Sequence, residues 1–285
     1  TDSCGGAVTA TLTATDVTGT DCSWTVTYTF TIEDLCGNEL TGQTYSNTGS
    51  DQTAPSLTGT AYAGTTGTNA CVSMAASAAP FNGTHAIEGY TDNCGGAVTA
   101  TLTDTDVTGT DCSWTVTYTF TIEDVCGNEL TGQTYSNTGS DQTAPSLTGT
   151  AYAGTTGTNA CVSMAASAAP FNGTHAIEGY TDNCGGAVTA TLTATDVTGT
   201  DCSWTVTYTF TIEDVCGNQL TGQTYSNTGS DQTAPTLTGT PYAGTTGTNA
   251  CVSMAASAAP FSGTHAIEGY TDNCGGAVMA TLTAT

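Results

Sequence analysis

The chain repeats itself with a period of 90 residues, and this repeat constrains its fold more than any other feature. Residues 1–90 and 91–180 differ at three positions, and residues 91–180 and 181–270 differ at five. The copies align without insertions, and the sequence starts and stops in mid-phase, so we expect a window from a longer array. Whatever fold one copy adopts, the other copies must adopt as well.

Each copy is long enough to be a domain with its own core. Solenoid repeats run at roughly 20 to 50 residues, whereas domains begin at about 50. A recurring DQTAP motif places a proline behind polar residues, which a strand interior does not tolerate. We therefore predict boundaries before Thr53, Thr143 and Thr233. The resulting segments are a C-terminal part of a repeat at 1–52, complete repeats at 53–142 and 143–232, and an N-terminal part at 233–285.

Residues 111–128 carry the strongest secondary-structure signal. Apolar side chains share one parity and threonines the other; the apolar ones are Trp114, Val116, Tyr118, Phe120 and Ile122. This alternation predicts a strand with one buried face and one exposed face. Residues 97–103 repeat the pattern, and shorter strand candidates lie at 129–135, 146–153, 160–164 and 175–180. The prediction is an all-β fold of tandem immunoglobulin-like antiparallel β-sandwich domains.

The cysteines indicate disulfides. Each 90-residue copy carries four of them, and the total of 13 is odd because the window cuts copies apart. An even number per domain favours disulfides in an oxidising compartment. A zinc site is the rival interpretation, but the CxxC spacing that is typical of zinc sites is absent.

The path of the chain suggests which cysteines pair. Cys94 lies 15 residues before Gly109 in a predicted turn and Cys126 lies 17 residues after it. One strand runs out and the next returns, so both cysteines should lie at one pole, with Cys112 at the other. The predicted pairs are Cys4–Cys36, Cys94–Cys126, Cys184–Cys216, Cys71–Cys112 and Cys161–Cys202. Each loop of about 30 to 40 residues should contribute roughly 3 to 4 kcal/mol.

The charge balance is extreme, with 25 acidic residues, no lysine or arginine and a net charge of −25. Such a surface argues against nucleic acid and anionic membrane as partners, and no apolar run is long enough to span a bilayer. Carboxylates should crowd the joint between two domains, where they either repel or hold calcium. The candidate ligands are Asp106, Asp111, Asp141, Asp182, Glu213 and Asp214. A solvated acidic joint is the alternative.

Other polar residues give weaker signals. One histidine occurs per copy without a second imidazole nearby, which predicts surface residues at His85, His175 and His265. Cys161 and Ser163 have no neighbouring base and no GxSxG turn, so we expect no enzymatic activity. Asn82 and Asn172 fit the N-glycosylation pattern, but Ser262 replaces them in the next copy.

Three motifs resemble those of a known family: TDNCGG at 91–96, YTFTIEDVCGN at 118–128 and DQTAP at 141–145. They are similar to motifs of HYR-like, immunoglobulin-type tandem repeats in large cell-surface adhesins of the Bacteroidota, including gliding-motility adhesins. The resemblance implies secretion to the bacterial cell surface, a tandem β-sandwich stalk and an adhesive or filamentous role.

An array of near-identical copies suits a spacer better than a catalyst, because each copy adds about 40 Å of length. We therefore predict a structural stalk of a secreted bacterial surface adhesin or filament, whose partners are further copies of the repeat in the same chain. One alternative is a set of multivalent carbohydrate- or protein-binding repeats, for instance for surface glycans, with Tyr152 or Tyr180 exposed. Another is a self-assembling extracellular fibre of like chains.

Overall fold

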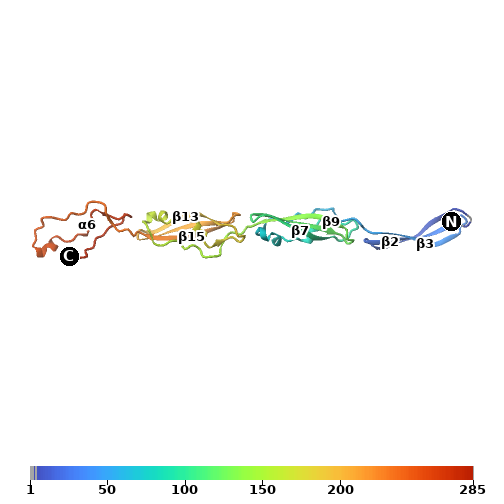
Figure 1. Cartoon of the computed structure of the whole chain (residues 1–285), viewed down its shortest axis with the longest axis horizontal. Helices are drawn as coiled ribbons and strands as arrows, with labels where there is room; N and C mark the ends of the chain where they lie inside the picture. Colours follow the sequence, from blue (N-terminus) through green and yellow to red (C-terminus); the bar gives the residue numbers. More distant parts are fainter. Residues whose placement is uncertain (1–2, 4, 285) are drawn as a thin grey trace. The chain divides into compact units, whose positions relative to one another are not determined.

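The computed structural model describes residue 3 and residues 5–284. The chain separates into two compact units, Thr1–Gln142 and Thr143–Thr285. The first unit holds the partial repeat 1–52 and the complete repeat 53–142, and the second holds the complete repeat 143–232 and the partial repeat 233–285. Figure 1 shows long strands in both units and a C-terminal segment around α6 that is drawn mostly without strands.

The strands of the first unit are β1 (Val8–Thr20), β2 (Ser23–Asp34), β3 (Glu39–Gly49), β4 (Ser56–Leu57), β5 (Thr68–Asn69), β6 (Tyr90–Thr91), β7 (Thr99–Thr110), β8 (Ser113–Glu123) and β9 (Glu129–Ser140). Its helical turns are η1 (Val72–Met74), α1 (Ala75–Ala78) and α2 (Gly83–Ala86). Strands β1–β2–β3 form one antiparallel sheet, and β7–β8–β9 form another, which β5 extends in parallel along β9. The short strands β4 and β6 pair with each other.

The second unit repeats this order. Its strands are β10 (Ser146–Leu147), β11 (Thr158–Asn159), β12 (Tyr180–Thr181), β13 (Thr189–Thr200), β14 (Ser203–Glu213), β15 (Gln219–Ser230), β16 (Thr236–Leu237) and β17 (Tyr270–Thr271). Its helical turns are η2 (Val162–Met164), α3 (Ala165–Ala168), α4 (Gly173–Ala176), η3 (Val252–Met254), α5 (Ala255–Ala258) and α6 (Gly263–Ala266). The described residues contain no helix that is long and apolar enough to cross a membrane.

Strand β8 supplies the main face of the core, as its alternating sequence predicts. Its apolar side chains are buried and its threonines are less so. Gly109 lies at the end of β7, just before the turn of the β7–β8 hairpin; its φ is 109°, and a Cβ atom there would lie 2.2 Å from the carbonyl oxygen of Ser113. Only glycine fits such a turn without strain.

An irregular segment closes the core of each complete repeat. We call residues 60–90, and the equivalent residues 150–180 and 240–270, the cover segment. Its alanines pack on the strand aromatics, and hydrogen bonds fix it in place. The indole Nε1 of Trp114 donates to the carbonyl oxygen of Ala70 at 2.7 Å, and the Tyr118 hydroxyl donates to that of Ala79 at 2.8 Å. These buried polar atoms are therefore satisfied by the segment that excludes water from them.

The structure confirms the predicted tandem all-β architecture, with a less regular second layer than the sequence indicates. The predicted strand at 175–180 is largely helix α4 and a turn. The side chain of Asn172 accepts hydrogen bonds from the backbone N–H groups of Thr174 and His175, which caps this helix. Of the predicted strand at 160–164, residues 162–164 form the η2 turn instead.

Candidate functional site

The first unit contains a disulfide between Cys22 and Cys126, whose Cα atoms lie 4.9 Å apart. Cys22 lies in the turn between β1 and β2, and Cys126 lies in the turn between β8 and β9. The two residues are 104 positions apart, which is more than one repeat. The bond therefore joins the partial repeat 1–52 to the complete repeat that follows it. We call it the hairpin bond.

The second unit contains a disulfide of another kind, between Cys161 and Cys274, with a Cα separation of 5.2 Å. Cys161 lies in the cover segment just before η2, and Cys274 follows β17 in the next copy, 113 positions later. The side-chain amide of Asn273 contacts both sulfur atoms, at 3.5 Å from Cys161 and 3.2 Å from Cys274. This bond, the cover bond, also joins one copy to the next.

Because the sequence repeats, the cysteines of both bonds have equivalents in the other copies. The equivalent cysteines in the middle of the chain are also disulfide-bonded: Cys71, Cys112, Cys184 and Cys216. Among the described residues, four cysteines are exposed free thiols: Cys36, Cys94, Cys202 and Cys251. One free thiol thus lies in each of the four complete or partial repeats.

Several predicted disulfides are wrong. Cys126 bonds to Cys22 rather than Cys94, and Cys161 bonds to Cys274 rather than Cys202. Cys36 is a free thiol, and its predicted partner Cys4 lies outside the described residues. In both bonds the partners belong to different copies. The pairs Cys71–Cys112 and Cys184–Cys216 stay predictions.

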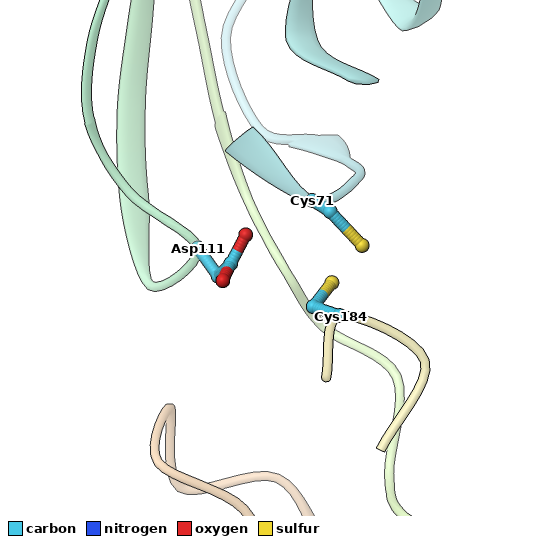
Figure 2. A group of neighbouring side chains, drawn as sticks. All are labelled: Cys71, Asp111 and Cys184. Atoms are coloured by element: carbon cyan, nitrogen blue, oxygen red, sulfur yellow. The ribbon is translucent and has the colours of Figure 1, made fainter. Parts of the chain in front are cut away.

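The error concerns partners, because the predicted poles are correct. Figure 2 shows Cys71, which follows β5, beside Asp111 at the tip of the β7–β8 hairpin. The Asp111 carboxylate accepts a hydrogen bond of 2.8 Å from the backbone N–H of Val72. At one pole the cover segment is therefore tied to the hairpin tip that carries Cys112. Cys126 and Cys161 instead bond to a cysteine of a neighbouring copy.

Asp51 connects the two copies at the junction in the first unit. Its backbone N–H donates to the carbonyl oxygen of Asp21 at 2.7 Å, within the partial repeat. Its carboxylate receives contacts of 3.5 Å from the side-chain amides of Asn93 and Asn128, which belong to the complete repeat. The junction next to Cys22–Cys126 is therefore built from polar side chains of both copies.

A buried carboxylate lies at the same junction. Asp92 is 8% exposed, and its Oδ2 accepts a hydrogen bond of 2.9 Å from the backbone N–H of Cys94. Its Oδ1 is buried and has no hydrogen-bond partner. Ligand atoms of Asp51, Asp92 and Cys94 lie within 4.8 Å of one another. Two carboxylates and an orphaned oxygen fit the hard oxygen ligands that calcium prefers.

The predicted calcium ligands are held in different ways. Asp106 lies exposed on β7 opposite Thr117, so the strand carries it away from the hairpin tip. Asp141 is buried, and its N–H donates to the carbonyl oxygen of Asp111 at 2.6 Å. Asp182 repeats the environment of Asp92, including the orphaned Oδ1.

The remaining two predicted ligands are engaged within their own turn. The Asp214 carboxylate accepts hydrogen bonds from the backbone N–H groups of Cys216 and Asn218, and Glu213 accepts from the side chain of Gln219. At the equivalent Asp124, burial raises the pKa, but hydrogen bonds from the side chain and backbone of Asn128 and from the backbone of neighbouring residues outweigh it and lower the pKa. These hydrogen bonds therefore favour the ionised form of Asp124.

Each complete repeat also has an aromatic pocket, of about 300 Å³ in the first unit and about 290 Å³ in the second. The ring of Tyr62 lies 4.5 Å from that of His85 in the first, and Tyr152 and His175 repeat this arrangement. Tyr180, expected to be exposed if the repeats bind ligands, is half-buried, and its hydroxyl donates to Gln223.

The two predicted glycosylation positions have a structural role. Asn82 and Asn172 are exposed and cap α2 and α4. Ser262 caps α6 in the same way, by accepting from the backbone N–H of His265. Both residue types are good helix caps, which explains why serine can replace asparagine here. Attachment of a glycan stays a prediction.

Comparison with known families gives one match. Residues 155–228 match the family described as a HYR-like domain with 4 cysteines. The matched range contains Cys161, Cys184, Cys202 and Cys216. No curated protein sequence matches the chain. The chain thus contains a HYR-like domain in a disulfide-bonded, all-β repeat array, as is typical of extracellular adhesion-type repeats.

Proposed function

We propose that the chain is part of the stalk of a secreted bacterial surface adhesin or filament, in which disulfides cross-link consecutive copies of the repeat. One observation carries the proposal: Cys22–Cys126 and Cys161–Cys274 each join one copy of the repeat to the next. A disulfide inside a domain stabilises that domain alone. A disulfide between domains also holds the junction, which is the weak point of a string of domains.

The positions of the bonds determine which residues carry a pulling force. A force that enters at the N-terminal side reaches Cys22 and passes through sulfur to Cys126, so the residues between them carry no load. Cys161–Cys274 shields the residues between its own ends in the same way. A complete repeat can lose its hydrogen bonds under load without lengthening the chain by the 104 or 113 residues that each bond spans.

The composition supports an exposed role outside the cell. The chain has 25 acidic residues and no lysine or arginine, so it offers no cleavage site to proteases that require a basic residue. A large net charge also keeps neighbouring stalks soluble and apart. These properties suit a spacer, as does the HYR-like match at residues 155–228.

Single-molecule stretching of the chain under oxidising and reducing conditions tests the proposal. At about 3.3 Å per extended residue, reduction should release about 700 Å of additional contour length. A Cys22→Ser, Cys126→Ser variant should release part of that length without reductant, while the Cys36→Ser variant, which removes a free thiol, should behave like the parent chain. Equal stretched contour lengths with and without reductant would contradict a stalk whose copies are cross-linked by disulfides.

A second candidate function is multivalent carbohydrate binding. The aromatic pocket recurs in each complete repeat with Tyr62 beside His85 and Tyr152 beside His175, and aromatic rings are common platforms for sugar rings. Binding of the oxidised chain to immobilised glycans, lost in a Tyr62→Ala, Tyr152→Ala variant, would favour this function over the stalk. Thr117→Ala with Thr207→Ala, on the strands, serves as the matched control.

A further inference from the structure

One buried oxygen at the junction of the first unit lacks a partner among the described residues. The Asp92 carboxylate is 8% exposed, and its Oδ1 accepts no hydrogen bond from the residues that the structure describes. Its Oδ2 accepts one of 2.9 Å from the backbone N–H of Cys94. A buried ionised carboxylate is normally paired with a positive charge or bound to a metal. Half of this carboxylate is therefore buried without the partner that its charge requires.

A second carboxylate lies close to Asp92 and comes from the preceding copy. One carboxylate oxygen of Asp51 and one of Asp92 lie within 4.8 Å of each other. The backbone N–H of Thr53 donates to the half-buried Asp51 at 3.1 Å. The side-chain amides of Asn93 and Asn128 lie 3.5 Å from its oxygens, which is long for a hydrogen bond. The two negative groups therefore lie together with little compensation.

Asp21, at the tip of the β1–β2 hairpin, brings a third carboxylate to this junction. The backbone N–H of Asp51 donates to the carbonyl oxygen of Asp21 at 2.7 Å, which holds the two residues together. Burial, and then the carboxylates of Asp51, Asp21 and Asp92, raises the pKa of the Cys94 thiol. All three negative charges therefore lie near one sulfur atom.

The second unit brings together the equivalent carboxylates. Asp201, Asp231 and Asp272 each have a carboxylate oxygen within 4.8 Å of the Cys274 sulfur. That sulfur is bonded to Cys161, so it is not a thiolate ligand. The donors that the two units share are therefore carboxylate oxygens, which suit a hard cation such as calcium rather than zinc or copper.

The chain has no positive side chain with which to neutralise this group. It contains no lysine or arginine, and the one histidine of the complete repeat 53–142, His85, contacts the ring of Tyr62 in the aromatic pocket. A metal cation at the junction can therefore come only from solution.

The spacing of the carboxylates suits one calcium ion. Calcium binds oxygen at about 2.3 to 2.6 Å, so two of its ligands lie at most about 5 Å apart. The oxygens of Asp51 and Asp92 are within this limit, at no more than 4.8 Å. One ion between them would give both carboxylates the positive charge that the protein does not supply.

We propose that the junction of the first unit is a calcium site, in which Asp51 of the partial repeat and Asp92 of the complete repeat bind one ion and Asp21 supplies a third carboxylate. Water completes the six to eight oxygen ligands that calcium takes. Neither Asp51 nor Asp92 is among the ligands predicted from the sequence. Because Asp21 is next to Cys22, the ion and the Cys22–Cys126 bond hold the same junction. The site rests on the carboxylates and is independent of the proposed stalk, which stretching tests separately.

Isothermal titration calorimetry of the full chain with calcium, after removal of metal by a chelator, tests the site. We expect a dissociation constant of about 10⁻⁴ to 10⁻³ M, the range of extracellular calcium modules. Asp51→Asn and Asp92→Asn keep the shape of the side chain and remove its charge. Each variant should bind one ion fewer than the parent chain. The difference is counted because an acidic chain attracts calcium elsewhere as well. A count equal to that of the parent would overturn the proposal.

Two control variants separate this site from other kinds of binding. Asp106→Asn removes the same charge from an exposed position on β7 and should leave the count unchanged. Cys94→Ser should also leave it unchanged, because calcium does not require a sulfur ligand. A lost ion in Asp106→Asn would indicate diffuse attraction by the net charge, and a lost ion in Cys94→Ser would indicate a thiolate site. Either result would overturn the proposal.

The third carboxylate has a test of its own. Asp21→Asn removes a charge that the structure places beside the ion and should weaken calcium binding at this site by about three- to tenfold. An unchanged affinity would overturn the place of Asp21 in the site.

Hydrogen exchange gives a local measurement that does not depend on counting ions. The peptide 91–104 contains Asp92, and Asp104 distinguishes it from its equivalent in the second unit. Calcium should slow exchange in this peptide by about threefold or more in the parent chain and in Asp106→Asn. It should have no such effect in Asp92→Asn. Equal protection by calcium in the parent chain and in Asp92→Asn would overturn the proposal.

Discussion

Strands β2 and β8 have the same sequence in different surroundings, and the comparison separates what forms a sheet from what forms a core. Residues 23–34 and 113–124 are identical. Trp24 pairs with Gly49 and Trp114 pairs with Gly139, in the same antiparallel register. Yet Trp114 is buried and Trp24 is partly exposed. Pairing is therefore set by the hairpins, and burial is set by the cover segment.

The difference identifies where stability resides. A hairpin closes over short sequence separations and needs little beyond its alternation and turns. The core needs the cover segment, whose Ala70 and Ala79 accept hydrogen bonds from residues 44 and 39 positions away. A complete repeat gains both contributions, whereas the partial repeat 1–52 gains only the first and is also tied to its neighbour by Cys22–Cys126.

Removing the hairpin bond should have the largest effect on this comparison. In the chain-entropy description, a bond that closes a loop of about 100 residues contributes about 4 to 5 kcal/mol. In a Cys22→Ser, Cys126→Ser variant we expect hydrogen exchange in β1, β2 and β3 to accelerate by about 10³-fold. Exchange in β8 should change far less, because its own cover segment remains. Unchanged exchange in the partial repeat would contradict the role of the bond as its anchor.

Truncating the tryptophan tests burial directly. Trp114→Ala removes a fully buried ring and should destabilise its repeat by about 4 kcal/mol. Trp24→Ala, at the equivalent exposed position, should cost about 1 kcal/mol or less in the monomer. Urea unfolding monitored by hydrogen exchange of peptides from β2 and β8 measures both. Equal losses at the two sites would show that the cover segment contributes little.

The tyrosine hydroxyl gives a smaller matched difference. Tyr118 donates to the carbonyl oxygens of Ala79 at 2.8 Å and Ala76 at 3.2 Å. Tyr118→Phe leaves these buried acceptors without that donor and should cost about 1 to 2 kcal/mol. Tyr28→Phe should be neutral, since residues 1–52 have no cover segment to accept from it. The same exchange experiment distinguishes the two, and a neutral Tyr118→Phe would contradict this reading of the core.

The sequence predicts the sheet of each repeat well because its signal is local. The alternation of Trp114, Val116, Tyr118, Phe120 and Ile122 marks the buried face of β8 residue by residue. The cover segment has no such period. Its alanines, glycines and capping Asn82 form short turns whose positions are set by contacts with residues far away in the sequence, so the predicted strand at 175–180 is largely helical.

The path of the strands does not determine which cysteines pair, for a physical reason. The out-and-back path of the strands places Cys94 and Cys126 at one pole, which is correct. The prediction then assumed that each copy is closed on itself. Equivalent residues occur in every copy, so a bond within a copy and a bond to the next copy have the same sequence signature. Only the position of neighbouring copies distinguishes them.

The acidic junction has a feature that the sequence does not indicate. Asp111 and Asp214 are predicted calcium ligands, and both accept backbone hydrogen bonds in their own repeat. The orphaned oxygen belongs to Asp92, whose burial depends on the packing of the turn after β6 and leaves no signal in the sequence.

We expect calcium to bind at Asp51 and Asp92 and to stabilise the junction between the partial and the complete repeat. A cation would give the buried Oδ1 of Asp92 a partner and relieve repulsion between the carboxylates. At a calcium concentration about five times the dissociation constant, we expect a stabilisation of about 1 kcal/mol, measured as a rise in melting temperature. Asp92→Asn should abolish the rise, and the exposed Asp106→Asn should not. A rise that survives in Asp92→Asn would place the ion elsewhere.

The smallest expected effect concerns the free thiol of Cys94 at the same junction. Burial, followed by the carboxylates of Asp51, Asp21 and Asp92, raises the pKa of this thiol. The thiolate is the reactive form, so at pH 8 Cys94 should be alkylated slowly, and its rate should increase as the pH rises. Asp51→Asn lowers the pKa and should accelerate alkylation about two- to threefold at pH 8, as followed by mass spectrometry. Two of these carboxylates, Asp21 and Asp51, come from the partial repeat. An unchanged alkylation rate in Asp51→Asn would therefore mean that the Asp51 carboxylate of the partial repeat does not raise the pKa of Cys94 in the complete repeat.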